Sequence, residues 1–475
     1  MIKRRRRRRH SRRREARSIR SLLSFAAAYP RQIAFSSFLT FFLCWLILTK
    51  SLPLFLAARQ PDIALALHPN SSRALIVKAE NLRKLLLSSM ASESAQPEAA
   101  AEQTIARLPK AQDAPPEAAA LSVRESLRNQ IREAASRAIA NDPLNATAFR
   151  FLAEVSDPTG GTRALMQEAV LRSRRETTAL LWLLNDSYLS KDWNAAIGYA
   201  DVLLRTSPEL DQYVMRYLVA VSHNAEGRAL LAGKLAEPPQ WRARFLGSFN
   251  DLFDKDQSAL ALIADMRKSP RPAATREIGA YIGHLVWYNA TDTAFNLWLK
   301  TLAPEKLDSL GFLVNPGFES DPDDIVPFNW FVRLGQNAAA EFVPSPQSIG
   351  QRLLHISFGN GRVQFPEVSQ VLVLPPGRYR IEGKLRGSII SKRGLRWQLR
   401  CVPPFETVFG ESELLSGHSD QWRVFTMEAQ IPQNKGCKGE LLRLFHESRS
   451  ASEDFITGEV WFGSLRLEAI RTQSQ

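Results

Sequence analysis

The spacing of apolar and charged residues marks out one uncharged stretch near the start of the chain. Residues 33–49 hold no charge and no proline. A helix that spans the hydrocarbon core of a bilayer needs about 20 apolar residues, with a lower limit of about 17. Beyond Lys50, whose amine can reach the lipid headgroups, residues 51–58 add apolar length. The pattern therefore predicts a single transmembrane helix over residues 33–57.

Helical periodicity dominates residues 59–310. Residues 178–188 and 192–205 each carry an apolar face at helical spacing, and Pro208 follows at a point where a helix cannot continue. Residues 91–116 interrupt the pattern with Ala, Glu, Gln and Pro, a composition typical of a flexible segment. We therefore expect an array of helical hairpins with a flexible insertion near 91–116.

The periodicity changes from helical to strand-like at about residue 311. In residues 378–385 apolar and charged side chains alternate, and residues 395–401 repeat this alternation, which places apolar side chains on one face of a strand. Further strand-like runs cover residues 353–358, 368–374, 422–430, 440–446 and 460–469. Seven or more strands between Gly and Pro turns predict an antiparallel β-sandwich over residues 311–470. The fold class is then multidomain α + β.

Basic residues concentrate in the N-terminal tail, residues 1–32. The first 20 residues hold twelve Lys or Arg and one Glu, which gives +11 of the formal net charge of +14. The rest of the chain is close to neutral, which argues against nucleic acid as its partner. An arginine-rich segment beside a span stays in the cytoplasm and can contact anionic lipid. We expect a cytoplasmic tail, with residues after 58 outside the cytoplasm. A regulatory contact of the tail with nucleic acid or an acidic protein is a weaker alternative.

A cleaved signal peptide is the alternative to a permanent anchor. Its apolar core would be about 7–15 residues long and would end in small residues. The apolar region here is longer, which favours the uncleaved anchor. Cleavage after Ala58 would leave the same domains soluble outside the cytoplasm.

The three cysteines divide between the membrane and the exported part. Cys44 lies within the predicted span, which leaves Cys401 and Cys437 as a pair outside the cytoplasm. An oxidising compartment allows such a pair to join, so we expect a disulfide between Cys401 and Cys437. Two unpaired buried thiols are the alternative, and they would suit a cytoplasmic domain.

The helical region resembles tetratricopeptide repeats. Residues 178–188 form a segment with Trp, Leu and Tyr, and residues 192–205 follow after a short turn with Ala-Ala-Ile and a later proline. The spacings between copies are irregular, so a generic array of helical hairpins is the alternative. Either arrangement implies a curved surface that holds a protein partner.

Four segments of the C-terminal region resemble the carbohydrate-binding-module class of galactose-binding-like jelly rolls. These segments are 315–319 (Asn-Pro-Gly-Phe-Glu), 327–330 (Pro-Phe-Asn-Trp), 374–381 (Leu-Pro-Pro-Gly-Arg-Tyr-Arg-Ile) and 458–463 (Gly-Glu-Val-Trp-Phe-Gly). The resemblance implies a sugar that stacks on tryptophan, with Trp330 and Trp422 as the candidate contacts. Trp397 and Trp461 share their strand faces with apolar residues, so we expect both in the core.

The same resemblance bears on metal binding. This class usually carries an aspartate at the position of Gly463. A calcium ion needs several oxygen ligands, so the glycine leaves Glu319 as a weak candidate for a structural calcium site. We expect no other metal and no cofactor.

The order of basic tail, span, repeats and sandwich resembles bacterial membrane proteins associated with exopolysaccharide production and export. This implies a single-pass protein of the inner membrane, with a periplasmic helical array that binds envelope or polysaccharide-assembly proteins and a sandwich that contacts polysaccharide. The sequence holds no phosphate-binding glycine-rich loop, no His-Glu-x-x-His and no Gly-x-Ser-x-Gly. We therefore expect a non-enzymatic scaffold. A polysaccharide hydrolase or lyase with an unrecognised active site is the alternative.

Overall fold

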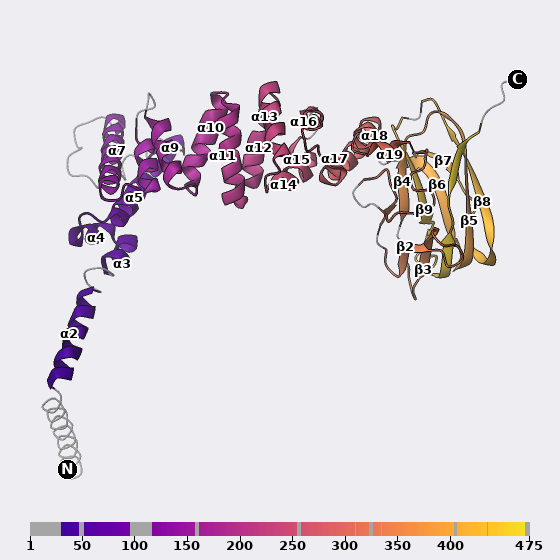
Figure 1. The fold of residues 1–475 in the computed structure, drawn as a ribbon, viewed down its shortest axis with the longest axis horizontal. Helices are drawn as coiled ribbons and strands as arrows, with labels where there is room; N and C mark the ends of the chain where they lie inside the picture. Colours follow the sequence, from indigo (N-terminus) through magenta and orange to yellow (C-terminus); the bar gives the residue numbers. More distant parts are fainter. Residues whose placement is uncertain are drawn as a thin grey trace, which may run out of the picture. The chain divides into compact units, whose positions relative to one another are not determined.

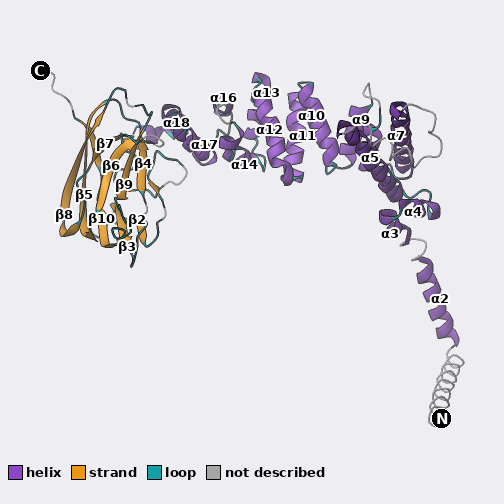
Figure 2. Cartoon of the chain, turned by 180° about the vertical axis from the view of Figure 1, so that it is seen from behind, coloured by secondary structure: helices purple, strands orange, loops and turns teal. Residues whose placement is uncertain are grey.

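The computed structural model describes most of the chain beyond the N-terminal tail. The described residues are 30–46, 52–95, 116–156, 161–253, 258–308, 310–322, 326–333, 335–365, 367–402, 406–434 and 436–470. They fall into two compact units, Met1–Pro208 and Glu209–Gln475 (Figure 1). In the described part of the chain the first unit is helical, and every strand belongs to the second unit, which also contains helices (Figure 2).

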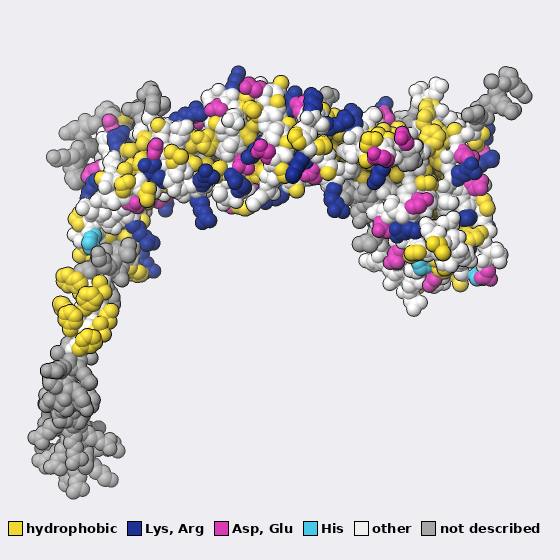
Figure 3. Space-filling model, in the orientation of Figure 1, with side chains coloured by type: hydrophobic (Ala, Val, Ile, Leu, Met, Phe, Trp, Pro, Cys, Tyr) yellow, Lys and Arg dark blue, Asp and Glu magenta, His cyan; other side chains and the backbone are white. Residues whose placement is uncertain are grey.

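The predicted membrane span falls on two helices. These are α2, Pro30–Leu46, and α3, Leu52–Arg59, and residues 47–51 lie outside the described residues. Apolar side chains form the surface of α2 (Figure 3), where Phe35 and Phe38 are 67% and 66% exposed. Among the described residues, no single helix combines the length and the apolar character needed to cross a membrane.

The first unit packs helices that follow one another along the chain. After α3 these are α4 (Pro61–Leu67), α5 (Ser72–Ala95), α7 (Pro116–Asn141), α8 (Ala146–Glu154), α9 (Thr162–Arg172), α10 (Thr177–Leu189) and α11 (Trp193–Thr206). Helix α5 packs on α7, α8 on α9, and α10 on α11 (Figure 1). The predicted helical character is confirmed here. Of the expected flexible insertion, residues 91–95 and 116 are helical, and residues 96–115 lie outside the described part.

Side-chain caps and alanine contacts define these hairpins. At the start of α8, the side chain of Asn145 accepts a hydrogen bond of 3.1 Å from the backbone N–H of Ala148. Asp192 accepts an equivalent bond of 3.1 Å from Ala195 at the start of α11. Such caps satisfy N–H groups that a helix leaves unpaired in its first turn. Buried alanines such as Ala196 let the paired helices approach closely.

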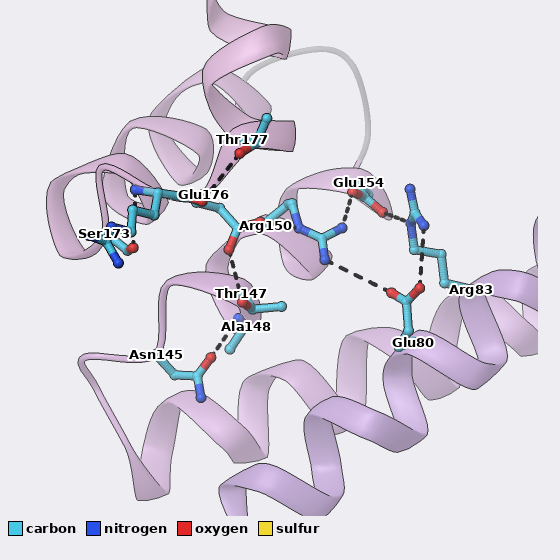
Figure 4. Close-up of polar contacts among 11 residues, drawn as sticks. Glu80, Arg83, Asn145, Thr147, Ala148, Arg150, Glu154, Ser173, Glu176 and Thr177 are labelled. Carbon is cyan, nitrogen blue, oxygen red and sulfur yellow. Dashed lines mark hydrogen bonds and ion pairs between the residues drawn. The ribbon is translucent and has the colours of Figure 1, made fainter. Parts of the chain in front are cut away.

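A buried arginine ties three helices of the first unit together. Arg150 on α8 is 7% exposed and pairs with Glu154 on the same helix. It also lies 2.7 Å from Glu176, which precedes α10, and 4.0 Å from Glu80 on α5 (Figure 4). A charge removed from water needs partners, because desolvation costs several kcal/mol. The three carboxylates therefore help to fix how α5, α8 and α10 pack.

The second unit begins with helices whose core is rich in aromatic rings. After the short 3₁₀ helix Pro208–Leu210 these are α12 (Asp211–Ser222), α13 (Ala225–Ala236), α14 (Arg242–Gly247), α15 (Phe249–Leu252), α16 (Ser258–Met266), α17 (Thr275–Trp287), α18 (Thr291–Leu299) and α19 (Pro304–Leu307). Phe249 meets Phe245 edge to face at 5.3 Å and Tyr281 of α17 at 5.9 Å. Arg242 is buried near them and donates hydrogen bonds of 2.8 Å to both carboxylate oxygens of Glu277.

The strands form two antiparallel sheets with a shared core. The first sheet has the order β1 (Phe331–Val332), β4 (Val368–Leu372), β9 (Glu440–His446), β6 (Leu395–Cys401) and β7 (Val408–Glu411). The second has the order β11 (Arg466–Ala469), β5 (Gly377–Ser391), β10 (Ile456–Phe462), β3 (Arg352–Phe358) and β2 (Ala338–Pro344), with β8 (Gly417–Ile431) also paired to β5. The core includes Trp397, Phe425 and Phe462. The predicted antiparallel sandwich is confirmed.

The sandwich packs against the last helices of the second unit. Phe328 is buried and lies 5.2 Å from Phe295 and 5.3 Å from Trp298, both on α18. In the turn before α18, the side chain of Asn289 accepts a hydrogen bond of 2.8 Å from the backbone N–H of Lys438. These contacts join the helical part of the second unit to two separate loops of the sandwich.

Candidate functional site

The six-stranded sheet has one face in the core and one face outside it. Along β5, Tyr379, Ile381 and Leu385 are buried in the core, while Arg380 and Lys384 are exposed on the outer face. Strand β8 alternates in the same way over its second half. This alternation is the one that the sequence predicts. Side chains of neighbouring strands meet on the outer face, where a ligand can reach them.

Five side chains on this outer face form a row across four strands. We call it the aromatic–cation row, and its members are His355, Trp461, Arg386, Trp422 and Lys384. Trp461 stacks on His355, with ring centroids 4.8 Å apart and planes at 14°. The strand register explains the contact, because Trp461 lies directly opposite His355 on β3 and Arg386 on β5.

Arg386 lies between the two tryptophans of the row. Its guanidinium carbon is 5.7 Å from the ring centroid of Trp461 and 5.1 Å from that of Trp422. The ammonium nitrogen of Lys384 is 5.2 Å from the Trp422 centroid. Cation–π contacts at exposed sites contribute about 0.5–1 kcal/mol each. The rings therefore restrict the positions of both cations.

The regular register of β5 and β8 reaches Leu385 opposite Arg423 and continues to place Trp422 opposite Arg386, where a bulge begins. Opposite the single residue Arg386 of β5, strand β8 places three residues, the last of which is Trp422. Extra residues of this kind bend a strand and redirect its side chains. Gly387 follows with a φ of +118°, and a Cβ there would lie 2.2 Å from the carbonyl oxygen of Glu459. A glycine is required at this close approach of β5 and β10.

The basic side chains of β5 fall into two groups. Arg378 and Arg380 pair with Glu428 on β8 at 3.1 Å and 2.9 Å. Hydrogen bonds from Arg380 and Arg378 hold the pKa of Glu428 below its usual value. In contrast, no carboxylate of the described residues lies within 4.0 Å of the charged nitrogens of Lys384 or Arg386. These two charges are the basic end of the row.

The opposite end of the row is acidic. Glu459 on β10 lies 3.6 Å from Nε2 of His355. Glu341 on β2 is directly opposite His355 in the antiparallel register. The row therefore runs from carboxylates of β2 and β10 beside His355 to cations of β5 beside Trp422 that have no carboxylate partner in the described part of the chain.

The structure separates the two tryptophans that the sequence indicated as glycan contacts. Trp422 is half-buried and belongs to the aromatic–cation row. Trp330 is 0% exposed, packs 5.4 Å from Phe318, and donates its Nε1–H to the carbonyl of Asn315 at 2.8 Å. The expectation of a glycan contact at Trp330 is corrected, because its buried ring offers no face to a sugar.

Trp461 also differs from the sequence-based expectation. Strand β10 ends at Phe462, so Leu465 does not continue the face on which Trp461 lies. Within β10, Val460 and Phe462 are buried, and Trp461 projects from the opposite face. Trp397 is fully buried, as expected. The Val-Trp-Phe alternation was the sequence signal that could have placed Trp461 outside the core.

Cys401 and Cys437 form the predicted disulfide, with a sequence separation of 36. Glu319, the weak candidate for calcium, is exposed. Among the described residues, no group of three His, Cys, Asp or Glu side chains could hold a metal ion. The segment 315–319 closes a turn instead, since the side chain of Asn315 hydrogen-bonds both the N–H and the carbonyl of Ser320.

A second candidate surface is a groove in the first unit. Its volume is about 710 Å³, and helices α5, α7, α8, α9 and α10 contribute to its walls. Met90 and Trp182 give it apolar surface. Arg163 and Asp186 also line it and form an ion pair at 3.2 Å. Apolar surface with charges at its border is suited to a protein segment.

Comparisons with known proteins locate similar sandwiches but assign no activity. No protein-family model matches the sequence, and no curated protein matches it. Among solved structures, a CBM4 module shares 13% identity over 33% of this chain and 99% of its own, with a TM-score of 0.25. TmCBM61, solved with β-1,4-galactotriose, shares 18% over 34% of this chain and 99% of its own, with a TM-score of 0.24. A β-1,3-glucan binding CBM6 from Bacillus halodurans shares 17% over 29% of this chain and 96% of its own, with a TM-score of 0.19. These values are too low to assign a ligand.

Proposed function

We propose that this protein is a non-enzymatic, membrane-anchored accessory protein of polysaccharide assembly or export, and that its sandwich binds glycan. The observation that carries the proposal is the aromatic–cation row on the outer face of the six-stranded sheet. Trp461 and Trp422 are half-buried there, and Arg386 separates them. The row is an ordered surface with both apolar area and hydrogen-bond donors.

The chemistry of this surface suits a sugar. A pyranose ring has apolar C–H faces and a polar rim, so its binding sites combine aromatic surface with a few fixed polar groups. Arg386 and Lys384 can only donate hydrogen bonds, and sugar hydroxyl oxygens accept them. The cation–π contacts restrict both side chains before a ligand arrives, which reduces the entropy lost on binding. The resemblance of segments 315–319 and 458–463 to carbohydrate-binding modules supports the same ligand.

The anchor in this proposal is the segment 33–57. Phe35, Phe38 and Phe41 of α2 are between 66% and 69% exposed. Hydrocarbon is the environment in which such a helix loses this unfavourable exposure to water. With the arginine-rich tail in the cytoplasm, the two units lie in the periplasm. The Cys401–Cys437 disulfide is consistent with an oxidising compartment.

The helices supply the protein contact of the proposed scaffold. Paired helices in the first unit, which resemble tetratricopeptide repeats in sequence, leave the groove beside Met90, Arg163 and Trp182 open. We assign this groove to an envelope protein of the polysaccharide-assembly system. Capture of such a protein by the full chain should be lost when Trp182→Ala and Arg163→Glu are combined. Unchanged capture would remove the groove from the proposal.

A glycan array tests the binding function. The purified full chain in detergent should bind a subset of the polysaccharides on the array. The Trp422→Ala/Trp461→Ala variant should lose most of this binding signal. Trp287→Ala is the matched control, because Trp287 is 60% exposed on α17 and lies outside the row. Binding that survives in the double variant would contradict the row as the site. Release of shorter chains from any bound polymer would contradict the non-enzymatic assignment.

A further inference from the structure

We infer that the sandwich selects an anionic polysaccharide, one whose sugars carry carboxylates, and that Arg386 and Lys384 bind the carboxylate beside Trp422. This inference rests on the proposed glycan-binding function and narrows it to one class of polymer. It goes beyond the binding of a neutral polysaccharide, which would use the aromatic rings and hydrogen bonds to hydroxyls but not the positive charge of the two cations.

The first observation is the contrast between two pairs of cations on the same strand. Arg378 and Arg380 share the carboxylate of Glu428, so their charge is locally balanced. Arg386 and Lys384 contact a tryptophan ring instead, and no carboxylate of the described residues lies within 4.0 Å of them. An anion delivered by a ligand would complete this pair of charges.

The second observation is the way in which Arg386 is held. Indole rings flank its guanidinium, with centroids at 5.7 Å and 5.1 Å. A guanidinium presents N–H groups in a fixed planar fork that matches both oxygens of a carboxylate. Stacking on Trp461 and Trp422 limits the rotation of this fork. The ammonium of Lys384 adds a second donor on the Trp422 ring.

The third observation is the charge polarity of the row, which gives the ligand a direction. Glu459 and Glu341 lie at the His355 end and would repel a carboxylate there. Glu382 is exposed on β5, on the β11 side of Lys384. The carboxylate of the ligand therefore binds at Arg386 and Lys384, and the rest of the polymer runs along the row toward Trp461. Strands lie about 4.8 Å apart, so the row covers roughly 14 Å across four strands.

The test compares polymers that differ only in their acid groups. Polygalacturonate, alginate and hyaluronan are each prepared in native form and in carboxyl-reduced form, and binding to the full chain in detergent is measured by titration calorimetry. At least one native polymer should bind about tenfold more tightly than its reduced form, because a charge-assisted bidentate contact is lost on reduction. The difference should shrink as salt is raised.

Variants separate this inference from the proposed function. Arg386→Met/Lys384→Met should abolish the preference for the native polymer, so that the native and reduced forms bind with equal affinity. Arg378→Met, a cation on the same strand, should preserve the preference. Equal binding of native and reduced forms overturns the inference and leaves glycan binding in place. Failure of every polymer in both forms overturns the proposed function itself. Thermal unfolding of each variant verifies that the sandwich is intact.

Discussion

The side chain of Asn289, in the turn before α18, accepts a hydrogen bond of 2.8 Å from the backbone N–H of Lys438. Lys438 follows Cys437 directly, so the disulfide holds the loop that meets the helices. Asn289 has a φ of +57°, a conformation that asparagine tolerates better than most residues. The bridge therefore acts on the sandwich and on its contact with the helical part of the second unit.

Removal of this bridge should destabilise the sandwich. Closing a loop of 36 residues contributes about 4 kcal/mol in the chain-entropy model. Cys437→Ser should therefore lower the free energy of unfolding of the second unit by about that amount, as measured by urea denaturation followed through tryptophan fluorescence. Cys44→Ser leaves the bridge intact and is the control. A Cys437→Ser protein as stable as the control would show that the bridge adds little to the fold.

Phe328 should couple the helices of the second unit to the sandwich. Its ring is buried between Phe295 and Trp298 of α18. Phe328→Ala removes this packing and should cost about 3–4 kcal/mol. We expect the unfolding transitions followed by circular dichroism at 222 nm and by tryptophan fluorescence to separate from each other. Phe312→Ala is the matched control, because Phe312 is 43% exposed. Coincident, unshifted transitions in the Phe328 variant would argue against this coupling.

The Arg242–Glu277 pair should make the second unit sensitive to acid. Burial alone would raise the pKa of Glu277, but hydrogen bonds from Arg242 and from the N–H of Ala274 outweigh it and lower the pKa. A carboxyl whose pKa is lower in the folded state stabilises the fold above its unfolded pKa of about 4.3. That contribution is lost as the pH falls through the folded pKa. Glu277→Gln should therefore cost about 3 kcal/mol at pH 7.

The pH dependence distinguishes this charge effect from a loss of packing. The stability difference between the natural protein and Glu277→Gln should narrow below about pH 4.3, because protonation then removes the same charge from the natural protein. Urea denaturation of both proteins at pH 7 and at intervals down to pH 3 measures this difference in the free energy of unfolding. A difference that stays constant over this range would contradict the assigned role of the charge.

Arg150 should be a stability determinant of the first unit. Arg150→Met leaves Glu80, Glu154 and Glu176 without their shared cation. Removing one partner of a buried ion pair costs about 3 kcal/mol, so the helical transition of the first unit should shift accordingly. Arg137→Met is the control, since Arg137 pairs with Glu133 on the surface and such pairs contribute about 0–1 kcal/mol. Equal effects of the two variants would contradict the account of the cluster.

Much of this architecture follows from residue spacing alone. Alternation in residues 378–385 predicts which side chains of β5 face the core, and the structure confirms it from Tyr379 to Leu385. The number of cysteines, together with the compartment predicted for them, leads to the expectation of the Cys401–Cys437 bridge, which the structure contains. The first feature depends only on the local alternation of residues, and the second depends only on which cysteines are available to pair. Both can be read directly from the sequence.

The candidate site could not be predicted in the same way. The aromatic–cation row depends on which residues of β3, β10, β5 and β8 lie opposite one another, and strand register is a tertiary property. The register of β8 against β5 places Trp422 opposite Arg386. The burial of Trp330 depends on Phe318, which has a φ of +60° in a turn that the periodicity does not reveal.

The most direct measurement of glycan binding at the row is hydroxyl-radical footprinting of the tryptophans. The full chain is exposed to radicals with and without a bound polymer, and oxidation of each tryptophan is quantified by mass spectrometry. Trp422 and Trp461 should react more slowly when polymer is bound. Trp287, 60% exposed on α17, should react at the same rate in both samples, and Trp330 and Trp397, each 0% exposed, should react little in either. Binding of polymer with unchanged oxidation of Trp422 and Trp461 would contradict glycan binding at the aromatic–cation row.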